Sequence, residues 1–185
     1  MSLMPEISKA TSGVIWITGL SGSGKTFLAN RLVEKYRSVG RTPIHLDGDD
    51  LRFVFETDQK YDPASRLSLA KIYSRLAKLL ASQGHLVIVS TISMFHEIHE
   101  LNRQNEFYCE IYIESDGISL KGRNNRSVYK NSDGSQTIYV VGIDISPEIP
   151  ISPHRTVSIN FDNPLSPDID ELFIFTFGFM STNRS

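Results

Sequence analysis

Residues 19–26 are Gly19-Leu20-Ser21-Gly22-Ser23-Gly24-Lys25-Thr26, a match to the pattern G-x-x-x-x-G-K-[ST]. This pattern is typical of the loop that cradles the phosphates of a bound nucleotide. Its glycines let backbone N–H groups turn towards the phosphates, and a helix that begins there adds the partial positive charge of its N-terminus. We expect Lys25 to reach the β- and γ-phosphates and the Thr26 hydroxyl to bind Mg²⁺. The residues predicted to hold the nucleotide are Gly19, Ser21, Gly22, Ser23, Gly24, Lys25 and Thr26.

The segments on either side of this loop favour a phosphate site over a plain glycine-rich turn. Residues 14–18 are β-branched and apolar, as a buried strand should be. After the loop, Leu28, Leu32 and Tyr36 recur on one face of a predicted helix. Strand, glycine loop and helix follow one another in the order that a nucleotide-binding site requires.

The composition is that of an ordinary globular protein. The 185 residues are 40% hydrophobic and 22% charged, so we expect a single domain over 1–185 with a substantial core. A formal net charge of −2 gives no electrostatic reason to expect nucleic acid or a membrane as partner. No apolar run is long enough to span a bilayer, and no secretory signal is visible. The only cysteine, Cys109, is expected to be a buried thiol, which predicts a cytoplasmic location.

Strands and helices are predicted to alternate along the rest of the chain. We expect strands over 43–46, 85–89, 107–113 and 156–159, and helices from Asp50, over 63–83 and 94–104, and from Asp168. This order predicts an α/β fold of the P-loop NTPase type, with a doubly wound parallel five-stranded sheet flanked by helices. The most hydrophobic segment, 85–89, is expected at the centre of the sheet. The predicted core face of the helix over 63–83 consists of Leu69, Ile72, Tyr73, Leu76 and Leu80.

Polar residues follow two of the predicted strands, at the edge where α/β sheets bind ligands. Asp47-Gly48-Asp49-Asp50 follows the second strand, and Ser90-Thr91-Ile92-Ser93 follows the third. A polar segment without apolar periodicity, about 121–137, is predicted to be a lid, with an ordinary surface loop as the alternative. The aromatic stretch 173–180 is expected to pack on the domain or on a partner subunit.

Together these motifs resemble those of adenylylsulfate kinases, which transfer the γ-phosphoryl group of ATP to a ribose 3′-hydroxyl. The similarity covers about 14–150 and rests on residues 16–26, 46–52 and 90–93, on Gly142-Ile143-Asp144, and on Glu148 and Pro150. The resemblance implies ATP and Mg²⁺ as cofactors and a nucleotide as the small-molecule acceptor. Related kinases also suggest a homodimer, which the sequence by itself does not establish.

The resemblance implies roles for three groups in catalysis: Lys25, Asp47 and Asp49. Asp47 is the carboxylate expected nearest the acceptor hydroxyl, as proton acceptor or through a metal-bound water, and with Thr26 it would hold the metal. Asp49 would support Arg52 or the metal shell. The alternative is that a carboxylate only caps the next helix, which suits Asp49 or Asp50 better than Asp47.

The remaining site residues are also carried over from the resemblance. Arg52 and Arg66 are candidate clamps on the phosphate-like end of the acceptor, because a guanidinium offers bidentate donors. In the lid, Arg123 and Arg126 match basic positions that contact the nucleotide. The predicted acceptor-binding residues are Asp47, Arg52, Tyr61, Arg66, Leu69, Ser90, Ile92, Ser93, Val140, Gly142 and Ile143.

Three departures from the family pattern concern the acceptor and the lid. Leu69 stands where the family has Asn, and Val140 stands where it has one of two aromatics that sandwich adenine. The other aromatic position keeps Tyr61, while 126–131 lacks the usual lid sequence. The altered pocket is similar to a kinase branch of bacterial surface-polysaccharide pathways, which phosphorylates a cytidine diphosphoramidate-type nucleotide.

Four functions therefore stay open at this point. Adenylylsulfate and a cytidine diphosphoramidate-type nucleotide are the two leading acceptors of a nucleotide 3′-hydroxyl kinase. A non-catalytic P-loop module would bind nucleotide without acceptor-dependent turnover, and the altered lid is its only support. A small-metabolite kinase would have a similar loop and size, but the spacing from Asp47 to Arg52 and the segment 142–144 argue against it.

Overall fold

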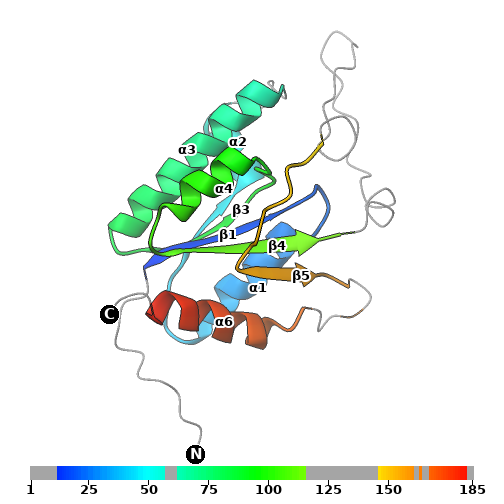
Figure 1. Ribbon diagram of the computed structural model, residues 1–185. Helices are drawn as coiled ribbons and strands as arrows, with labels where there is room; N and C mark the ends of the chain where they lie inside the picture. Colours follow the sequence, from blue (N-terminus) through cyan, green and yellow to red (C-terminus); the bar gives the residue numbers. More distant parts are fainter. Residues whose placement is uncertain (1–11, 57–61, 116–145, 161–162, 164–166, 183–185) are drawn as a thin grey trace, which may run out of the picture.

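The computed structural model describes residues 12–56, 62–115, 146–160, 163 and 167–182. Within these residues, parallel strands form one five-stranded sheet in the order β2-β3-β1-β4-β5 (Figure 1). This confirms the predicted α/β fold with a parallel sheet. The elements in chain order are β1 Gly13–Gly19, α1 Lys25–Ser38, β2 Ile44–Asp47, α2 Gly48–Val54, α3 Pro63–Ser82, β3 Leu86–Ser90, α4 His96–Arg103, β4 Tyr108–Glu114, β5 Arg155–Ser158 and α6 Ile169–Thr182.

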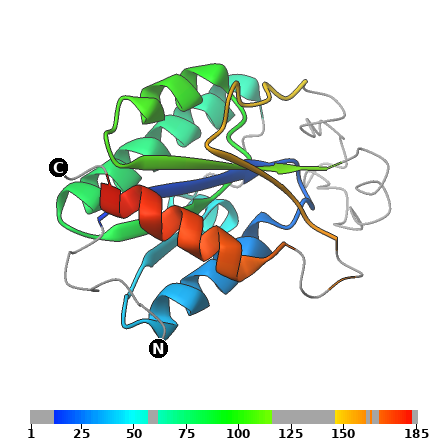
Figure 2. The ribbon, with the colours of Figure 1, turned by 60° about the horizontal axis from the view of Figure 1, so that its bottom comes forward.

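Helices cover both faces of the sheet. Helices α1 and α6 lie on one face, and α3 and α4 lie on the other (Figure 1 and Figure 2). Successive strand residues point to opposite faces, so β1 supplies Ile15 and Ile17 to the first core and Val14 and Trp16 to the second. Because β1 is buried along its whole length, the loop that follows it starts from a rigid base.

Three expectations about packing need correction. The centre of the sheet is β1, while β3 is the interior strand between β1 and β2. Ile72 is 41% exposed, because the face of α3 that meets the sheet is centred on Ala70 and Ala77 and Ile72 points away from it. Helix α4 begins at His96 and ends at Arg103, so it is shorter than the predicted 94–104.

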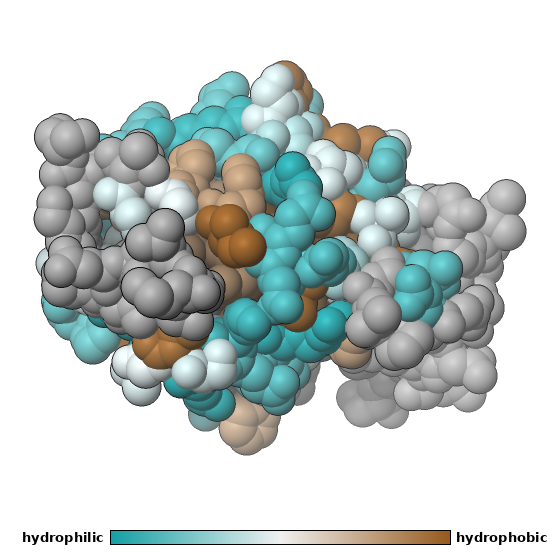
Figure 3. All heavy atoms as spheres, turned by 90° about the horizontal axis from the view of Figure 1, so that it is seen from below, coloured by the Kyte–Doolittle hydropathy of each residue, from teal (hydrophilic) through white to brown (hydrophobic). Residues whose placement is uncertain are grey.

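The aromatic segment near the C-terminus forms α6 and packs on the domain. The Tyr36 hydroxyl donates to Thr176 Oγ1 at 3.0 Å, and the rings of Tyr36 and Phe173 meet edge to face with centroids 5.0 Å apart. Ile174 remains 69% exposed. Figure 3 views this side of the molecule and shows a small group of apolar side chains beside hydrophilic ones. No helix in the described ranges is both long and apolar enough to cross a membrane.

Candidate active site

The glycine-rich loop joins β1 to α1 and has the backbone that its sequence predicts. Gly22 has φ of 77° and Gly24 has φ of 96°, a left-handed conformation that side chains other than glycine rarely adopt. A Cβ added at Gly19 would lie 2.8 Å from both Ser23 Oγ and the carbonyl oxygen of Ile113. Glycine at this position therefore allows the loop to fold back tightly against the ends of β1 and β4.

The start of α1 fits the phosphates of a nucleotide. No side chain caps the helix, and no acidic residue lies in its first turn, so the partial positive charge of its N-terminus is not offset by a carboxylate there. The Ser23 hydroxyl is buried and has no hydrogen-bond partner among the described residues. Lys25 Nζ donates to the carbonyl oxygen of Leu20 at 2.7 Å, which holds the ammonium group over the loop. An unsatisfied buried hydroxyl and an uncapped helix are both groups that phosphate oxygens would satisfy.

Asp47, the last residue of β2, connects this loop to the neighbouring strand. Its Oδ2 atom accepts hydrogen bonds from Thr26 Oγ1 and Ser90 Oγ, each at 2.7 Å. Its Oδ1 atom accepts from the backbone N–H of Asp49 at 2.9 Å. Burial alone would raise the pKa of Asp47, but these three hydrogen bonds outweigh it and hold the pKa below its usual range. The carboxylate is therefore ionised at neutral pH.

Asp47 is also the residue that caps α2, which corrects the expectation that Asp49 or Asp50 would do so. Its backbone is extended, with φ of −86° and ψ of 138°, so its side chain can turn back to the N–H of Asp49. Helix α2 consequently begins at Gly48, two positions before the predicted start. A Cβ at Gly48 would lie 3.0 Å from Thr91 Oγ1, so glycine allows α2 to begin close to the end of β3.

The paired oxygens of Thr26 and Asp47 fit Mg²⁺. Hydroxyl and carboxylate oxygens are ligands that this cation prefers, and Mg²⁺ usually takes one or two of them together with substrate phosphates and water. The described residues contain no group of three or more His, Cys, Asp and Glu side chains that could hold a metal without other ligands. Thr26 and Asp47 offer two of the oxygen ligands that a Mg²⁺ ion bound to nucleotide phosphates would take.

Other predicted residues lie around the same edge. Arg52 Nη1 is 3.9 Å from Asp49 Oδ1, one turn along α2. The Tyr73 hydroxyl donates to the carbonyl oxygen of Gly48 at 3.2 Å, which ties α3 to the start of α2. Burial raises the pKa of Tyr73 to about 12, so it remains a neutral donor.

The segment after β3 is held against β1. Thr18 Oγ1 donates to the carbonyl oxygen of Ile92 at 2.5 Å, and the hydroxyls of Thr91 and Ser93 are 3.0 Å apart. Ser93 has φ of 25°, an uncommon conformation for a residue other than glycine. Within the predicted segment 90–93, the side chain that contacts Asp47 is that of Ser90.

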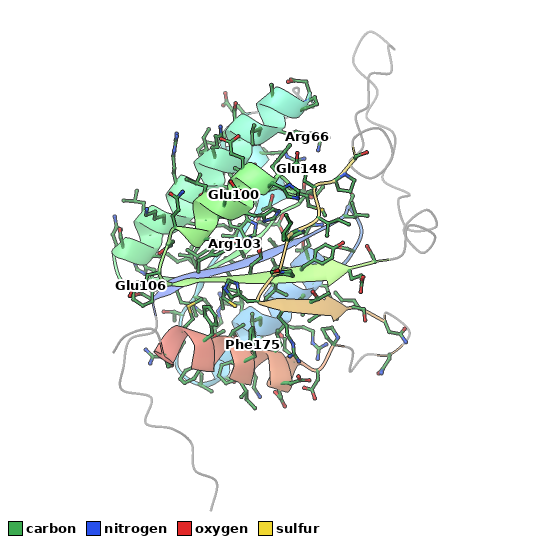
Figure 4. The ribbon with its side chains drawn as sticks, in the orientation of Figure 1. Arg66, Glu100, Arg103, Glu106, Glu148 and Phe175 are labelled. Atoms are coloured by element: carbon green, nitrogen blue, oxygen red, sulfur yellow. The ribbon has the colours of Figure 1, made fainter. Side chains whose placement is uncertain are left out.

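Two residues that were predicted to bind the acceptor nucleotide lie on α3, in different surroundings. Arg66 lies near the beginning of the helix and is half-buried, and Figure 4 shows it at the same end of the sheet as Glu148. Leu69 is buried at 8% exposure in the core between α3 and the sheet. The following candidates, with the lid over about 121–137, lie outside the described residues: Tyr61, Arg123, Arg126, Val140, Gly142 and Ile143.

Sequence reasoning did not predict the capping contact of Glu148, and it missed His45 as a neighbour of this site. The Glu148 carboxylate accepts from the backbone N–H of His96 and so caps α4, whose own N-cap residue Phe95 provides no side-chain bond. His45 Nε2 lies 2.9 Å from Ser90 Oγ. The signal for His45 was its position two residues before Asp47 in a strand, which places both on one face.

Comparisons with known proteins agree with this geometry. The family model described as adenylylsulphate kinase matches residues 11–158. The cytidine diphosphoramidate kinase of Campylobacter jejuni is 43% identical over 133 residues, covering 71% of this chain and 78% of the relative. The adenylyl-sulfate kinase of Bacillus licheniformis is 30% identical over 162 residues, covering 85% and 82%. The APS kinase CysC of Mycobacterium tuberculosis in complex with AMPPNP and APS superposes with a TM-score of 0.74 at 28% identity, covering 91% of this chain and 97% of that one.

Proposed function

Because the chain belongs to the adenylylsulphate kinase family and is a kinase with a hydroxyl acceptor, we propose a specific acceptor for it. The preferred acceptor is a cytidine diphosphoramidate-type nucleotide. The γ-phosphoryl group of ATP is transferred to the ribose 3′-hydroxyl of that nucleotide. The observation that carries the choice of acceptor is the identity of 43% to the cytidine diphosphoramidate kinase, against 29–33% to several bacterial adenylyl-sulfate kinases.

The residues at the edge of the sheet supply what phosphoryl transfer needs, namely positioning and neutralisation of charge. Lys25 and the N–H groups of the loop hold the phosphates of ATP. Thr26 and Asp47 hold Mg²⁺, which when bound offsets negative charge on the phosphate oxygens. Arg52 and Arg66 orient the acceptor through its phosphate-like end.

The two carboxylates have different parts in this proposal. Both oxygens of Asp47 already accept hydrogen bonds from the chain, so Asp47 serves the metal and fixes the start of α2. The Asp49 side chain is 58% exposed beside Arg52, and it accepts the hydrogen bond of the acceptor hydroxyl. This assignment differs from the one that the sequence favoured, because Asp47 already accepts three hydrogen bonds and we assign its remaining acceptor capacity to the metal.

The departures in the acceptor pocket support a cytosine base. Leu69 has no amide at the position where the family has Asn, and its side chain is buried in the apolar core. Stacking on an aromatic side chain contributes about 1–3 kcal/mol per base. Val140 in place of an aromatic therefore removes one stacking face, which costs adenine more than the smaller pyrimidine.

Adenylylsulfate is the second candidate acceptor, favoured by the family model and by the similarity to the Mycobacterium tuberculosis structure. Release of ADP, measured with each acceptor and with none, separates the two. We expect turnover with the cytidine nucleotide to exceed turnover with adenylylsulfate, and Val140→Phe to shift kcat/KM about tenfold towards the adenine acceptor. Efficient turnover of adenylylsulfate with none of the cytidine nucleotide would reverse the assignment, and nucleotide binding without acceptor-dependent ADP release would indicate a non-catalytic module.

Location and assembly complete the proposal. The single cysteine is a buried thiol, and ATP is an intracellular cofactor, so we place the protein in the cytoplasm. A homodimer is the assembly that related kinases suggest. Sedimentation of the protein with and without ATP tests it.

A further inference from the structure

His45, Ser90 and Asp47 form a row of hydrogen-bonded side chains on one face of the sheet. Strand pairing sets Asp47 opposite Ser90 and His45 opposite Ile88. Ile88 belongs to the core under α1, whereas Leu46 packs against the other core, so the alternation of side chains turns His45 and Asp47 towards α1. His45 Nε2 is 2.9 Å from Ser90 Oγ, and Ser90 Oγ is 2.7 Å from Asp47 Oδ2.

The direction of each hydrogen bond follows from counting protons. A serine hydroxyl has one proton to donate and can also accept. The Ser90 hydroxyl donates to Asp47 Oδ2, so its single proton points to Asp47. The contact between His45 Nε2 and Ser90 Oγ then requires the proton to be on His45 Nε2. A neutral ring with its proton on Nε2 and a charged ring would both donate from this atom.

We propose that His45 is a positioning residue that orients Asp47 through the Ser90 hydroxyl. By donating to Ser90 Oγ, His45 fixes the rotation of that hydroxyl and strengthens its bond to Asp47 Oδ2. Asp47 in turn connects three elements, since it also accepts from Thr26 on α1 and from the start of α2. His45 thus acts on the site without contacting the nucleotide.

The arrangement matters most when a nucleotide is bound. Without ligand, Asp47 Oδ2 has two hydroxyl donors, Thr26 and Ser90. If the Thr26 oxygen coordinates Mg²⁺, Ser90 remains as the side chain that holds Asp47 Oδ2 in place. Partners of this kind, one shell beyond a metal ligand, typically change affinity or activity by about tenfold to a hundredfold when removed.

The position of the proton gives a test that needs neither ATP nor acceptor. Nitrogen-15 NMR of the imidazole rings, in protein at a pH where His45 is neutral, distinguishes a proton on Nε2 from one on Nδ1. We expect the Nε2–H form in the wild type and a mixture of the two forms in Ser90→Ala. An Nδ1–H form in the wild type would overturn the proposal, and it would do so whether or not the proposed acceptor is correct.

A kinetic cycle tests the route through Ser90. We expect kcat to fall about tenfold to a hundredfold in Ser90→Ala and about threefold to tenfold in His45→Leu, with little change in KM for ATP. His45→Gln keeps an N–H donor near the position of Nε2 and should recover most of the activity. If His45 acts only through Ser90, adding His45→Leu to Ser90→Ala lowers kcat no further.

A matched control is available at His85, which is exposed just before β3. His85→Leu should leave kcat unchanged, and thermal unfolding of every variant shows whether it is folded. The proposal would be overturned if the reductions in kcat caused by Ser90→Ala and His45→Leu multiplied in the double variant. It would also be overturned if kcat of His45→Gln were no higher than kcat of His45→Leu. If the wild type turns over no acceptor, the same cycle is read in the Mg²⁺-dependent affinity for ATP.

Discussion

Two buried carboxylates lie on different faces of the sheet, and they are held in different ways. Glu110 lies in the middle of β4 with a fully buried side chain, and its carboxylate bonds to the side chains of His99 and Arg103. Asp47 lies at the end of β2 and is held by two hydroxyls and one backbone N–H. Burial alone would raise the pKa of both, and the hydrogen bonds lower it in both.

The difference concerns which donors can be exchanged. The Arg103 guanidinium lies 2.6 Å from Glu110 Oε2, the Tyr108 hydroxyl donates to Oε1 at 3.0 Å, and the carboxylate is fully buried, so a ligand does not reach it. Neutral hydroxyls bind Asp47 less strongly than a guanidinium would, and Thr26 can turn its oxygen to a cation. We conclude that Glu110 stabilises the fold, whereas Asp47 is available for chemistry.

The largest effect on stability is expected at Glu110. Glu110→Ala leaves His99 and Arg103 without their partner and should lower the free energy of unfolding by about 3–5 kcal/mol. Urea denaturation measures this. A loss below about 1 kcal/mol would mean that the buried pair does not hold β4 and α4 together.

The largest effect on activity is expected at Lys25. Lys25→Ala removes the charge that neutralises the transferring phosphoryl group, and kcat should fall at least about a hundredfold while the fold stays intact. Steady-state ADP release and circular dichroism test this. Near-normal turnover would show that the loop is not the catalytic phosphate site.

Asp47→Asn should separate activity from stability. Asparagine caps a helix about as well as aspartate, so α2 should persist and the free energy of unfolding should change by less than about 1 kcal/mol. The loss of charge at the metal should lower kcat on the order of tenfold to a hundredfold. If stability fell as far as in Glu110→Ala, both carboxylates would be structural, and the contrast between them would be lost.

Lowering the pH should reduce the stability that each of the two carboxylates contributes to the fold. A pKa that is lower in the folded state gives stability that is present above the unfolded pKa, about 4.3 for Glu. This stability is lost as the pH falls through the lowered folded pKa. Glu110→Gln should therefore make the unfolding free energy less dependent on pH below about 4. Equal slopes in wild type and variant would contradict the hydrogen-bond assignment at Glu110.

The fold could be predicted because its signals are local. Apolar runs mark the buried strands, and Gly24, Lys25 and Thr26 fix the phosphate loop by their order alone. The core face of α3 was predicted less well, since small residues such as Ala70 and Ala77 face the sheet while Ile72 does not. Small side chains, rather than the most hydrophobic ones, occupy the positions where α3 meets the sheet.

The contacts of the site depend on strand register, which a sequence does not display. Asp47 meets Ser90 because β2 and β3 pair in one particular register, and His45 joins them for the same reason. The cap on α4 comes from Glu148, 52 positions from His96, so no local pattern could indicate it. The capping role of Asp47 was missed because Gly48, rather than Asp50, begins the helix.

We propose that Thr26 and Asp47 form the cation site of the bound nucleotide. Calorimetric titration of ATP, with and without Mg²⁺, tests it most directly in wild type, Asp47→Asn and Glu110→Gln. We expect Mg²⁺ to increase the affinity for ATP in the wild type and in Glu110→Gln, and this increase to be about tenfold or more smaller in Asp47→Asn. An equal increase in all three proteins would contradict it.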